Sequence, residues 1–391
     1  MPKFPRILLW YFAGLNFLFI ALWWSGMIYL PYYFKQIGLS DARIGLLMSL
    51  VSLVLLVMVV PFGVLADRLN PRNLFLLGAL SFMAFAFFFL KNSSLKWFEL
   101  YMLLFGLASA LSSISLSALF LKEMSEQARG GQSALYNIGG VLGAGLGAEL
   151  GGKLVGFEQG KGLFLLMLAL AILLFLSGWA LPKKPGIPFK IWEYKKELAH
   201  PVSWILIFVV VIVASHAGFE HAGYTLLQTE VIGLSARQVG RLAFYLSFWM
   251  AFITWLSGKI QDRTMKPILW AGVALILSGV FQAVSGYAQG FLDFFLYRTA
   301  HTAGDCFSMV LMLVIASLVF AKSRAGGSWA VVVMFRNLSY FLFANLGGVI
   351  NQKWGFRESF VLSGTIMFLA GILLIFWLRP KFWQKLRIFD T

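Results

Sequence analysis

The chain has 391 residues, of which 60% are hydrophobic and only 12% are charged. Soluble globular proteins carry about one quarter charged residues, so this composition argues against a cytosolic enzyme and against a nucleic-acid-binding domain, despite a net charge of +16. The single cysteine, Cys306, excludes an internal disulfide framework and a zinc site built from several cysteines.

Twelve stretches of the chain are long and apolar enough to cross a bilayer as helices, which takes about 20 residues each. In chain order they are residues 7–34, 44–66, 73–90, 98–121, 132–152, 162–181, 201–228, 239–258, 267–287, 291–320, 327–350 and 358–378. The first stretch is too long for a cleaved signal peptide and leads directly into the second. The sequence therefore predicts an all-α, multi-pass integral membrane protein with twelve transmembrane helices.

The basic residues predict the orientation of these helices. Of the 32 lysines and arginines, twenty lie on the side of the N-terminus, ten lie in the opposite loops, and Arg298 and Arg336 lie within spans. Cytoplasmic loops carry the excess of basic residues, so we expect both termini in the cytoplasm, with the inner membrane of a bacterium as the location. Because topology accounts for the positive charge, we expect no nucleic-acid partner.

An internal repeat relates the two halves of the chain. Residues 38–45 (GLSDARIG) match residues 233–240 (GLSARQVG) at an offset of 195. The same offset carries Gly63, Asp67, Arg68 and Gly131 onto Gly258, Asp262, Arg263 and Gly326. A repeat in one constant register predicts two six-helix bundles, residues 1–181 and 201–391, joined by a cytoplasmic linker of residues 182–200.

The loop after the second span carries a resemblance to a known family. GVLADRLNPR at residues 63–72, with its weaker echo GKIQDR at 258–263, resembles the signature of the major facilitator superfamily, although Asn70-Pro71 stands where a glycine is usual. The resemblance implies two pseudo-symmetric bundles and a secondary transporter that works by alternating access. It also assigns a cytoplasmic gate, in which the aspartate bonds the end of a neighbouring helix. The gate residues are Gly63, Asp67, Arg68, Arg72, Gly258, Asp262 and Arg263.

Ionisable residues within spans are functional candidates because a charge inside a bilayer is costly. They are His216, Glu220 and His221 in the seventh span and Arg298, His301 and Asp305 in the tenth. His216 and Glu220 share a helix face, whereas His221 points away from Glu220. The three residues of the tenth span lie on one stripe. The resemblance places both helices at the central cavity.

Three interpretations of this cluster stay open. In the first, Glu220 and Asp305 carry protons, while Arg298 and His301 belong to the substrate or coupling site of a transporter for a small, anionic organic solute. In the second, a transition-metal cation is bound by the tenth span, whose ligand types suit such metals. The ligands of that alternative are His301, Asp305, Cys306, Met309 and Met312. In the third, the cluster is a structural network in which Arg298 pairs with Glu220 or Asp305.

Other polar and aromatic residues within spans are candidates for the cavity wall. They are Asn16, Trp23, Trp24, Asn137, Tyr224, Gln228, Arg336 and Asn337. The chain has no phosphate-binding lysine loop, nucleophile elbow or dinucleotide motif, so we expect neither an enzyme nor a cofactor. The expected protein is a monomer that binds a small molecule and protons within the lipid bilayer. A membrane sensor without transport activity is the alternative from a different class.

Overall fold

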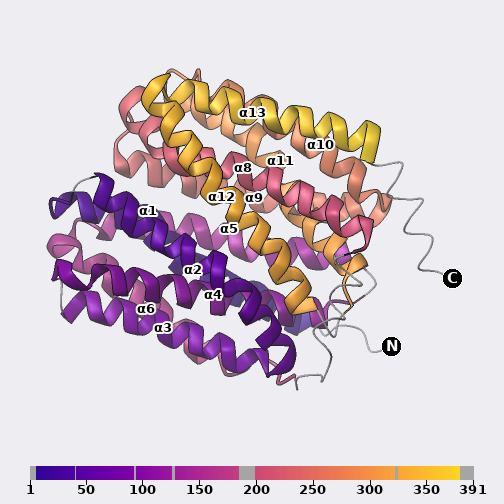
Figure 1. The fold of residues 1–391 in the computed structure, drawn as a ribbon, viewed down its shortest axis with the longest axis horizontal. Helices are drawn as coiled ribbons and strands as arrows, with labels where there is room; N and C mark the ends of the chain where they lie inside the picture. The colour runs from indigo at the N-terminus through magenta and orange to yellow at the C-terminus, as the bar shows by residue number, and fades with distance from the viewer. Residues whose placement is uncertain are drawn as a thin grey trace.

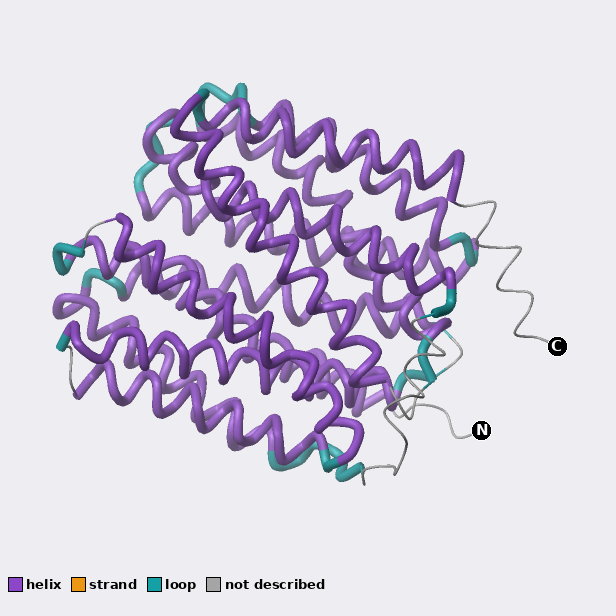
Figure 2. The backbone as a smooth tube through the Cα atoms, in the orientation of Figure 1, coloured by secondary structure: helices purple, strands orange, loops and turns teal. Residues whose placement is uncertain are grey.

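The computed structural model describes residues 6–39, 41–91, 94–125, 128–184, 199–321 and 325–378, and within these it consists of helices and short loops without a strand (Figure 2). The long helices are α1 (Arg6–Gln36), α2 (Asp41–Arg68), α3 (Pro71–Lys91), α4 (Phe98–Glu123), α5 (Arg129–Leu154), α6 (Lys161–Gly178), α8 (Pro201–Leu226), α9 (Ala236–Thr264), α10 (Pro267–Ser285), α11 (Phe291–Val319), α12 (Ala325–Lys353) and α13 (Phe356–Leu373). Short helical turns are η1 (Leu95–Trp97), η2 (Phe157–Gly160), η4 (Leu227–Val231) and η6 (Leu374–Leu378). Each predicted span matches one long helix with its adjoining turn.

Among the described helices, eleven have the length and hydropathy to cross a membrane, and α5 is the predicted span that does not reach this hydropathy. The helix is rich in glycine and carries Gln132 and Asn137. It packs along α1 on one side and along α9 on the other. Because α5 contacts other helices over so much of its surface, it needs less apolar surface than a lipid-facing helix.

The glycines of α5 explain this close packing. A side chain at Gly139, Gly143 or Gly147 would overlap carbonyl oxygens in successive turns of α1, such as that of Phe17. Small residues at every fourth position let two helix backbones approach closely in a membrane. The stripe therefore holds α1 and α5 together over three turns.

The two halves of the chain repeat the same helix contacts (Figure 1). In the first half α1 packs on α5, α3 packs on α4 and α6, and α2 packs on α4. In the second half α8 packs on α12, α10 packs on α11 and α13, and α9 packs on α11. Helices α5 and α9 form one junction between the halves, and α2 and α12 form the other. These contacts have the symmetry that the sequence repeat predicts.

The ends of the helices extend past the apolar stretches. Helix α9 begins after Ser235, whose hydroxyl and the side chain of Gln238 form a capping box, and it ends before Met265, which has a left-handed backbone conformation. The apolar stretch predicted only residues 239–258, because Arg237 and Arg263 lie in the polar first and last turns.

Candidate functional site

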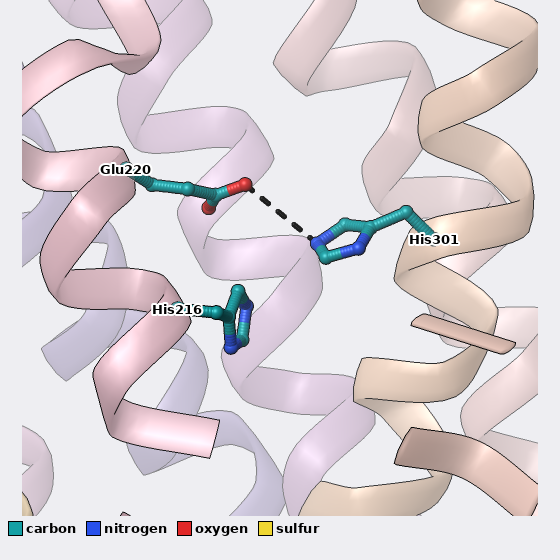
Figure 3. Close-up of side chains that lie close together, drawn as sticks. All are labelled: His216, Glu220 and His301. Carbon is teal, nitrogen blue, oxygen red and sulfur yellow. Dashed lines mark ion pairs between the residues drawn. The ribbon is translucent and has the colours of Figure 1, made fainter. Parts of the chain in front are cut away.

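Five ionisable side chains from α8 and α11 meet inside the second half. They are His216, Glu220, Arg298, His301 and Asp305. In Figure 3, Glu220 and His301 reach toward each other from the two helices, and His216 lies beside Glu220 on α8. The histidines and Arg298 are buried, and the two carboxylates are 17% exposed. Helical spacing predicted that His216 and Glu220 share one face of α8 and that Arg298, His301 and Asp305 share one face of α11, whereas the meeting of the two helices was implied by the resemblance alone.

Arg298 is held by side chains of α8 and α10, with support from α13. Its Nη1 donates to Oε1 of Glu220 at 2.5 Å and to Oε1 of Gln282 at 2.9 Å. Gln282, from α10, donates in turn to the hydroxyl of Ser363 on α13 at 3.2 Å. The guanidinium also lies over the ring of Tyr224, 5.1 Å from its centroid. Arg298 therefore neutralises Glu220 and is fixed in position by neutral partners.

Asp305 is shared by the two histidines. Its Oδ2 lies 3.1 Å from Nε2 of His301 and 3.4 Å from Nε2 of His216. Its Oδ1 accepts a hydrogen bond of 2.7 Å from the hydroxyl of Ser278, on α10. The rings of His216 and His301 meet edge to face, with centroids 5.2 Å apart.

Ser278 determines which nitrogen of His301 carries a proton. Nδ1 of His301 lies 2.9 Å from the carbonyl oxygen of Ser278 and 2.9 Å from its hydroxyl. A carbonyl oxygen can only accept, so Nδ1 is the protonated nitrogen of the neutral ring. The hydroxyl can accept from the same N–H because its own proton goes to Asp305.

The other nitrogen of His301 faces two acids. Nε2 is buried without an aligned hydrogen bond, and it lies 3.1 Å from Asp305 and 3.6 Å from Glu220. In the neutral ring this nitrogen would present a lone pair to two carboxylates, which repel it. A single proton, on Nε2 or on either carboxylate, removes the repulsion. The arrangement is thus chemically suited to hold one proton between three groups.

A metal ion is a second chemical possibility for part of this cluster. One ligand atom each from His216, Glu220 and His301 lie within 4.8 Å of one another. Cys306 is not in this group, because it is buried against Ile253 of α9 in a separate apolar cluster. The predicted metal set of the tenth span is therefore not assembled around Cys306, whose side chain packs toward α9.

The remaining candidates of the seventh span and the tryptophans of the first span differ in whether they contact the cluster. Tyr224 belongs to the cluster through Arg298, whereas Gln228 is buried and donates to the carbonyl of Tyr224 at 3.2 Å. The side chain of His221 lies outside the described residues. Trp23 and Trp24 are half-buried on α1 and contact each other, with ring centroids 5.3 Å apart.

Two of the three asparagines predicted for the cavity wall hold helices together. Asn16 is buried and donates to the carbonyl oxygen of Tyr136 at 2.8 Å, which ties α1 to α5. Asn137 is buried and donates to the carbonyl oxygen of Met309 at 3.4 Å, which ties α5 to α11. Hydropathy places polar residues in spans but does not indicate which neighbour each one faces.

Arg336 lies half-buried on α12, one turn before Tyr340. The hydroxyl of Tyr340 is within electrostatic range of Arg336 and of Glu220 and Asp305. The neighbouring Asn337 is 7% exposed, and its Nδ2 has no hydrogen-bond partner among the described residues.

Asp67 joins α2 of the first half to α12 of the second. Its buried carboxylate accepts from the backbone N–H of Gly326 at 3.1 Å and of Gly327 at 2.7 Å, at the start of α12. Lys122, from α4, approaches the same carboxylate at 2.8 Å. A side chain at Gly63 would collide with the backbone of Gly326, so this glycine permits the contact.

Asp262 makes the matching contact at the other junction. Its carboxylate accepts from the backbone N–H of Gly130 at 2.8 Å and of Gly131 at 2.9 Å, at the start of α5. Gly258 permits the approach, because a side chain there would meet Gly130 and Ala134. Each aspartate thus caps a helix of the opposite half, where a negative charge is favoured by the helix dipole.

The arginines expected at the gate lie in different surroundings. Arg68 and Arg263 are exposed at the same end of the molecule as the two aspartates. Arg72 is buried over the ring of Trp179, 5.1 Å from its centroid, within the first half. Arg72 lies at the start of α3, which packs on α4 and α6 of the first half, so its place in the gate stays a prediction.

The symmetric contacts of Asp67 and Asp262 agree with the family to which sequence comparison assigns the chain. Residues 12–292, more than half of the chain, match the sequence model of the Major Facilitator Superfamily. The chain belongs to the major facilitator superfamily. It is therefore a multi-pass integral membrane protein of a transporter family.

Two known proteins illustrate the likeness. "Multidrug resistance protein MdtG" of Salmonella paratyphi C (strain RKS4594) is 24% identical over 363 residues, which cover 88% of this chain and 89% of that protein. The crystal structure of the human organic anion transporter MFSD10 (TETRAN) superimposes with a TM-score of 0.76 at 15% identity, covering 96% of this chain and 100% of that chain. The second comparison shows the shared fold.

Sequence reasoning missed several partners of the site in this major facilitator superfamily chain. Ser278 and Gln282 of α10 hold His301 and Arg298, and Lys122 of α4 holds Asp67. A serine or glutamine in a span is common, so neither gives a signal alone. The repeat did offer one signal, because it pairs Gly131 with Gly326, and both contact an aspartate.

Proposed function

We propose that the protein is a proton-coupled secondary transporter that moves a small organic solute by alternating access. The family supplies the transport activity, and the names of the two similar proteins refer to multidrug resistance and to organic anion transport. Glu220, His301 and Asp305 are the proposed proton carriers.

The observation that carries the proposal is the position of Nε2 of His301 between two carboxylates. Arg298 offsets one of the two negative charges, so one further proton makes the cluster neutral. Movement of the cluster between the two sides of the bilayer costs less free energy when the cluster is neutral than when it is charged. Three acceptors within reach of one proton also allow it to enter from one group and leave from another.

The contacts of Asp67 and Asp262 support the alternating-access part of the proposal. They close one end of the molecule, which the distribution of basic residues makes the cytoplasmic end. The proposed transport cycle breaks both caps together when the two halves rock about the central site.

The test is proton movement coupled to solute uptake in proteoliposomes. A thermal-shift screen of organic solutes first finds a ligand of the purified protein, and an internal pH-sensitive dye then reports proton entry with that ligand. We expect Glu220→Gln and Asp305→Asn each to abolish uptake driven by a pH gradient and to retain exchange of labelled solute at equal pH. Retained exchange separates loss of coupling from loss of folding.

The matched control is Glu358→Gln, which removes an exposed carboxylate from the start of α13. It should leave gradient-driven uptake unchanged. Gradient-driven uptake that survives both Glu220→Gln and Asp305→Asn would refute proton coupling at this site.

Transition-metal transport is the second candidate, favoured by the ligand geometry of His216, Glu220 and His301. Arg298 argues against it, because its guanidinium occupies Oε1 of Glu220 at 2.5 Å and repels a cation. A bound metal would have to displace that contact.

A further inference from the structure

The second arginine within the spans has no acid to pair with. Arg298 has Glu220, but for Arg336 no hydrogen bond or ion pair is found in the part of the chain that the structure describes, and its one electrostatic neighbour is Tyr340. A charge within a bilayer is costly, and such a residue normally has an identifiable partner. Because the described chain does not supply that partner, a ligand is the candidate.

The direction of Arg336 follows from the exposed face of α12. Leu338, Leu342 and Val349 are exposed apolar residues on one side of this helix, which is the side that faces lipid. At 100° per residue, Arg336 lies about 140° around the helix from their mean direction and Tyr340 lies about opposite to it. Since Tyr340 is also within range of Glu220 and Asp305, Arg336 borders the same interior as the proton cluster.

The depth of Arg336 follows from its distance to the gate. It lies ten residues beyond Gly326, which is about 15 Å along a helix. The intervening Trp329, Val332 and Val333 are buried. No nitrogen of Arg336 is among the buried atoms without a partner, whereas Nδ2 of Asn337 is. The guanidinium is thus accessible just above the sealed end, with an unpaired amide donor on the next residue.

We propose that Arg336 binds the carboxylate or sulfonate of an organic anion, which is the transported solute. This proposal rests on the proposed transport function. A guanidinium suits these oxyanions because it can donate two parallel hydrogen bonds to them. The apolar surroundings of a membrane bundle select an anion with an apolar body.

The charged residues inside the helix bundle couple the binding of this anion to the binding of the proton. The five-residue cluster alone carries one negative charge when both histidines are neutral, and Arg336 brings the whole interior to neutrality, because Arg298 and Arg336 together balance Glu220 and Asp305. A bound anion alone leaves one excess negative charge, and a bound proton alone leaves one excess positive charge. Both together restore neutrality, so each ligand increases the affinity for the other. Tyr224 and Tyr340 are the neutral titratable groups at the edge of this set.

The test uses three probes with one apolar body: 4-phenylbutyrate, its neutral amide 4-phenylbutyramide and the cation 4-phenylbutylamine. Thermal unfolding and calorimetric titration of the full chain in detergent measure binding. Titration in two buffers with different ionisation enthalpies counts the protons taken up. The variants are Arg336→Gln, Arg336→Lys and the control Arg357→Gln, which removes an exposed arginine from α13.

We expect phenylbutyrate alone to stabilise the wild-type protein, with about one proton taken up for each anion bound. Arg336→Gln should weaken this binding about tenfold to a hundredfold, the size expected for hydrogen bonds to a charged group. The affinity of Arg336→Lys for phenylbutyrate should lie between those of the wild type and Arg336→Gln. Arg357→Gln should bind phenylbutyrate as the wild type does. Without ligand, Arg336→Gln should unfold at a temperature no lower than Arg357→Gln.

Three binding results would overturn the anion site, and so would one stability result. The binding results are absence of stabilisation by phenylbutyrate, equal binding by Arg336→Gln, and a preference for the amide or the amine. A loss of stability in unliganded Arg336→Gln would also overturn it, because it would give the arginine a structural role. Anion binding that needs Arg336 but takes up no proton would leave the anion site standing and would contradict the proton coupling of the proposed function.

Discussion

Arg298→Met should lower the free energy of unfolding by about 3 kcal/mol or more, because it leaves Glu220 as a buried carboxylate without its cation. Adding Glu220→Gln to this variant should recover most of the loss, since the new amide can donate to Gln282 and neither position of the pair then carries a charge. Equilibrium unfolding in detergent of the two single variants and the double variant measures the coupling energy between the two residues.

The control for this cycle is Arg357→Met, an exposed arginine outside the cluster, for which we expect a change within about 0.5 kcal/mol. The account would be contradicted if the double variant were as unstable as Arg298→Met. Glu220 would then not depend on Arg298, and the short contact between them would have little energetic weight.

Asp67→Asn should open the end of the molecule that contains the two aspartates. The amide keeps the shape of the side chain but loses its charge, so Lys122 and the N–H groups of Gly326 and Gly327 lose a charged acceptor. Hydrogen bonds to a charged group are worth about 1.5–3 kcal/mol, which corresponds to a shift of about tenfold or more in the ratio of open to closed molecules. Asp262→Asn should act in the same direction more weakly, because Asp262 is half-buried and no ion pair to it is found among the described residues.

The measurement is labelling of one introduced cysteine by a membrane-impermeant maleimide. Ala330→Cys reports the α2–α12 junction and Ala134→Cys reports the α5–α9 junction, since both alanines are buried beside the gate glycines. Both are made in Cys306→Ser, which removes the native thiol. Rocking of two rigid halves predicts faster labelling at both positions in Asp67→Asn. Unchanged labelling at both positions would show that the cap does not hold the gate closed.

Sequence patterns predicted the parts of the site that lie within one helix. Helical spacing placed His216 beside Glu220 and aligned Arg298, His301 and Asp305, because a helix fixes which residues share a face. The constant offset between Asp67 and Asp262 predicted equivalent positions for the two caps. These inferences needed no knowledge of how helices are arranged.

Contacts between helices were less accessible to sequence reasoning. Asn16 donates to the carbonyl oxygen of Tyr136, a partner that could not be predicted because hydropathy does not reveal which side of α1 faces α5. Arg72 stacks on Trp179, and the loop motif could not indicate this contact because Trp179 is distant in sequence. Ser278 controls the tautomer of His301 through its backbone carbonyl, and every residue type offers such a carbonyl.

The central claim, that Glu220, His301 and Asp305 hold one proton, is tested most directly by infrared difference spectroscopy of the purified full-length protein. The account predicts that acidification from about pH 8 to pH 5, the range in which histidine ordinarily changes charge, produces one carboxylic-acid or imidazolium signal in the wild type. That signal should disappear or change its band position in Asp305→Asn and in His301→Gln, and it should persist in Glu358→Gln. A wild-type spectrum without such a signal, or one left unchanged by Asp305→Asn and His301→Gln, would contradict the account.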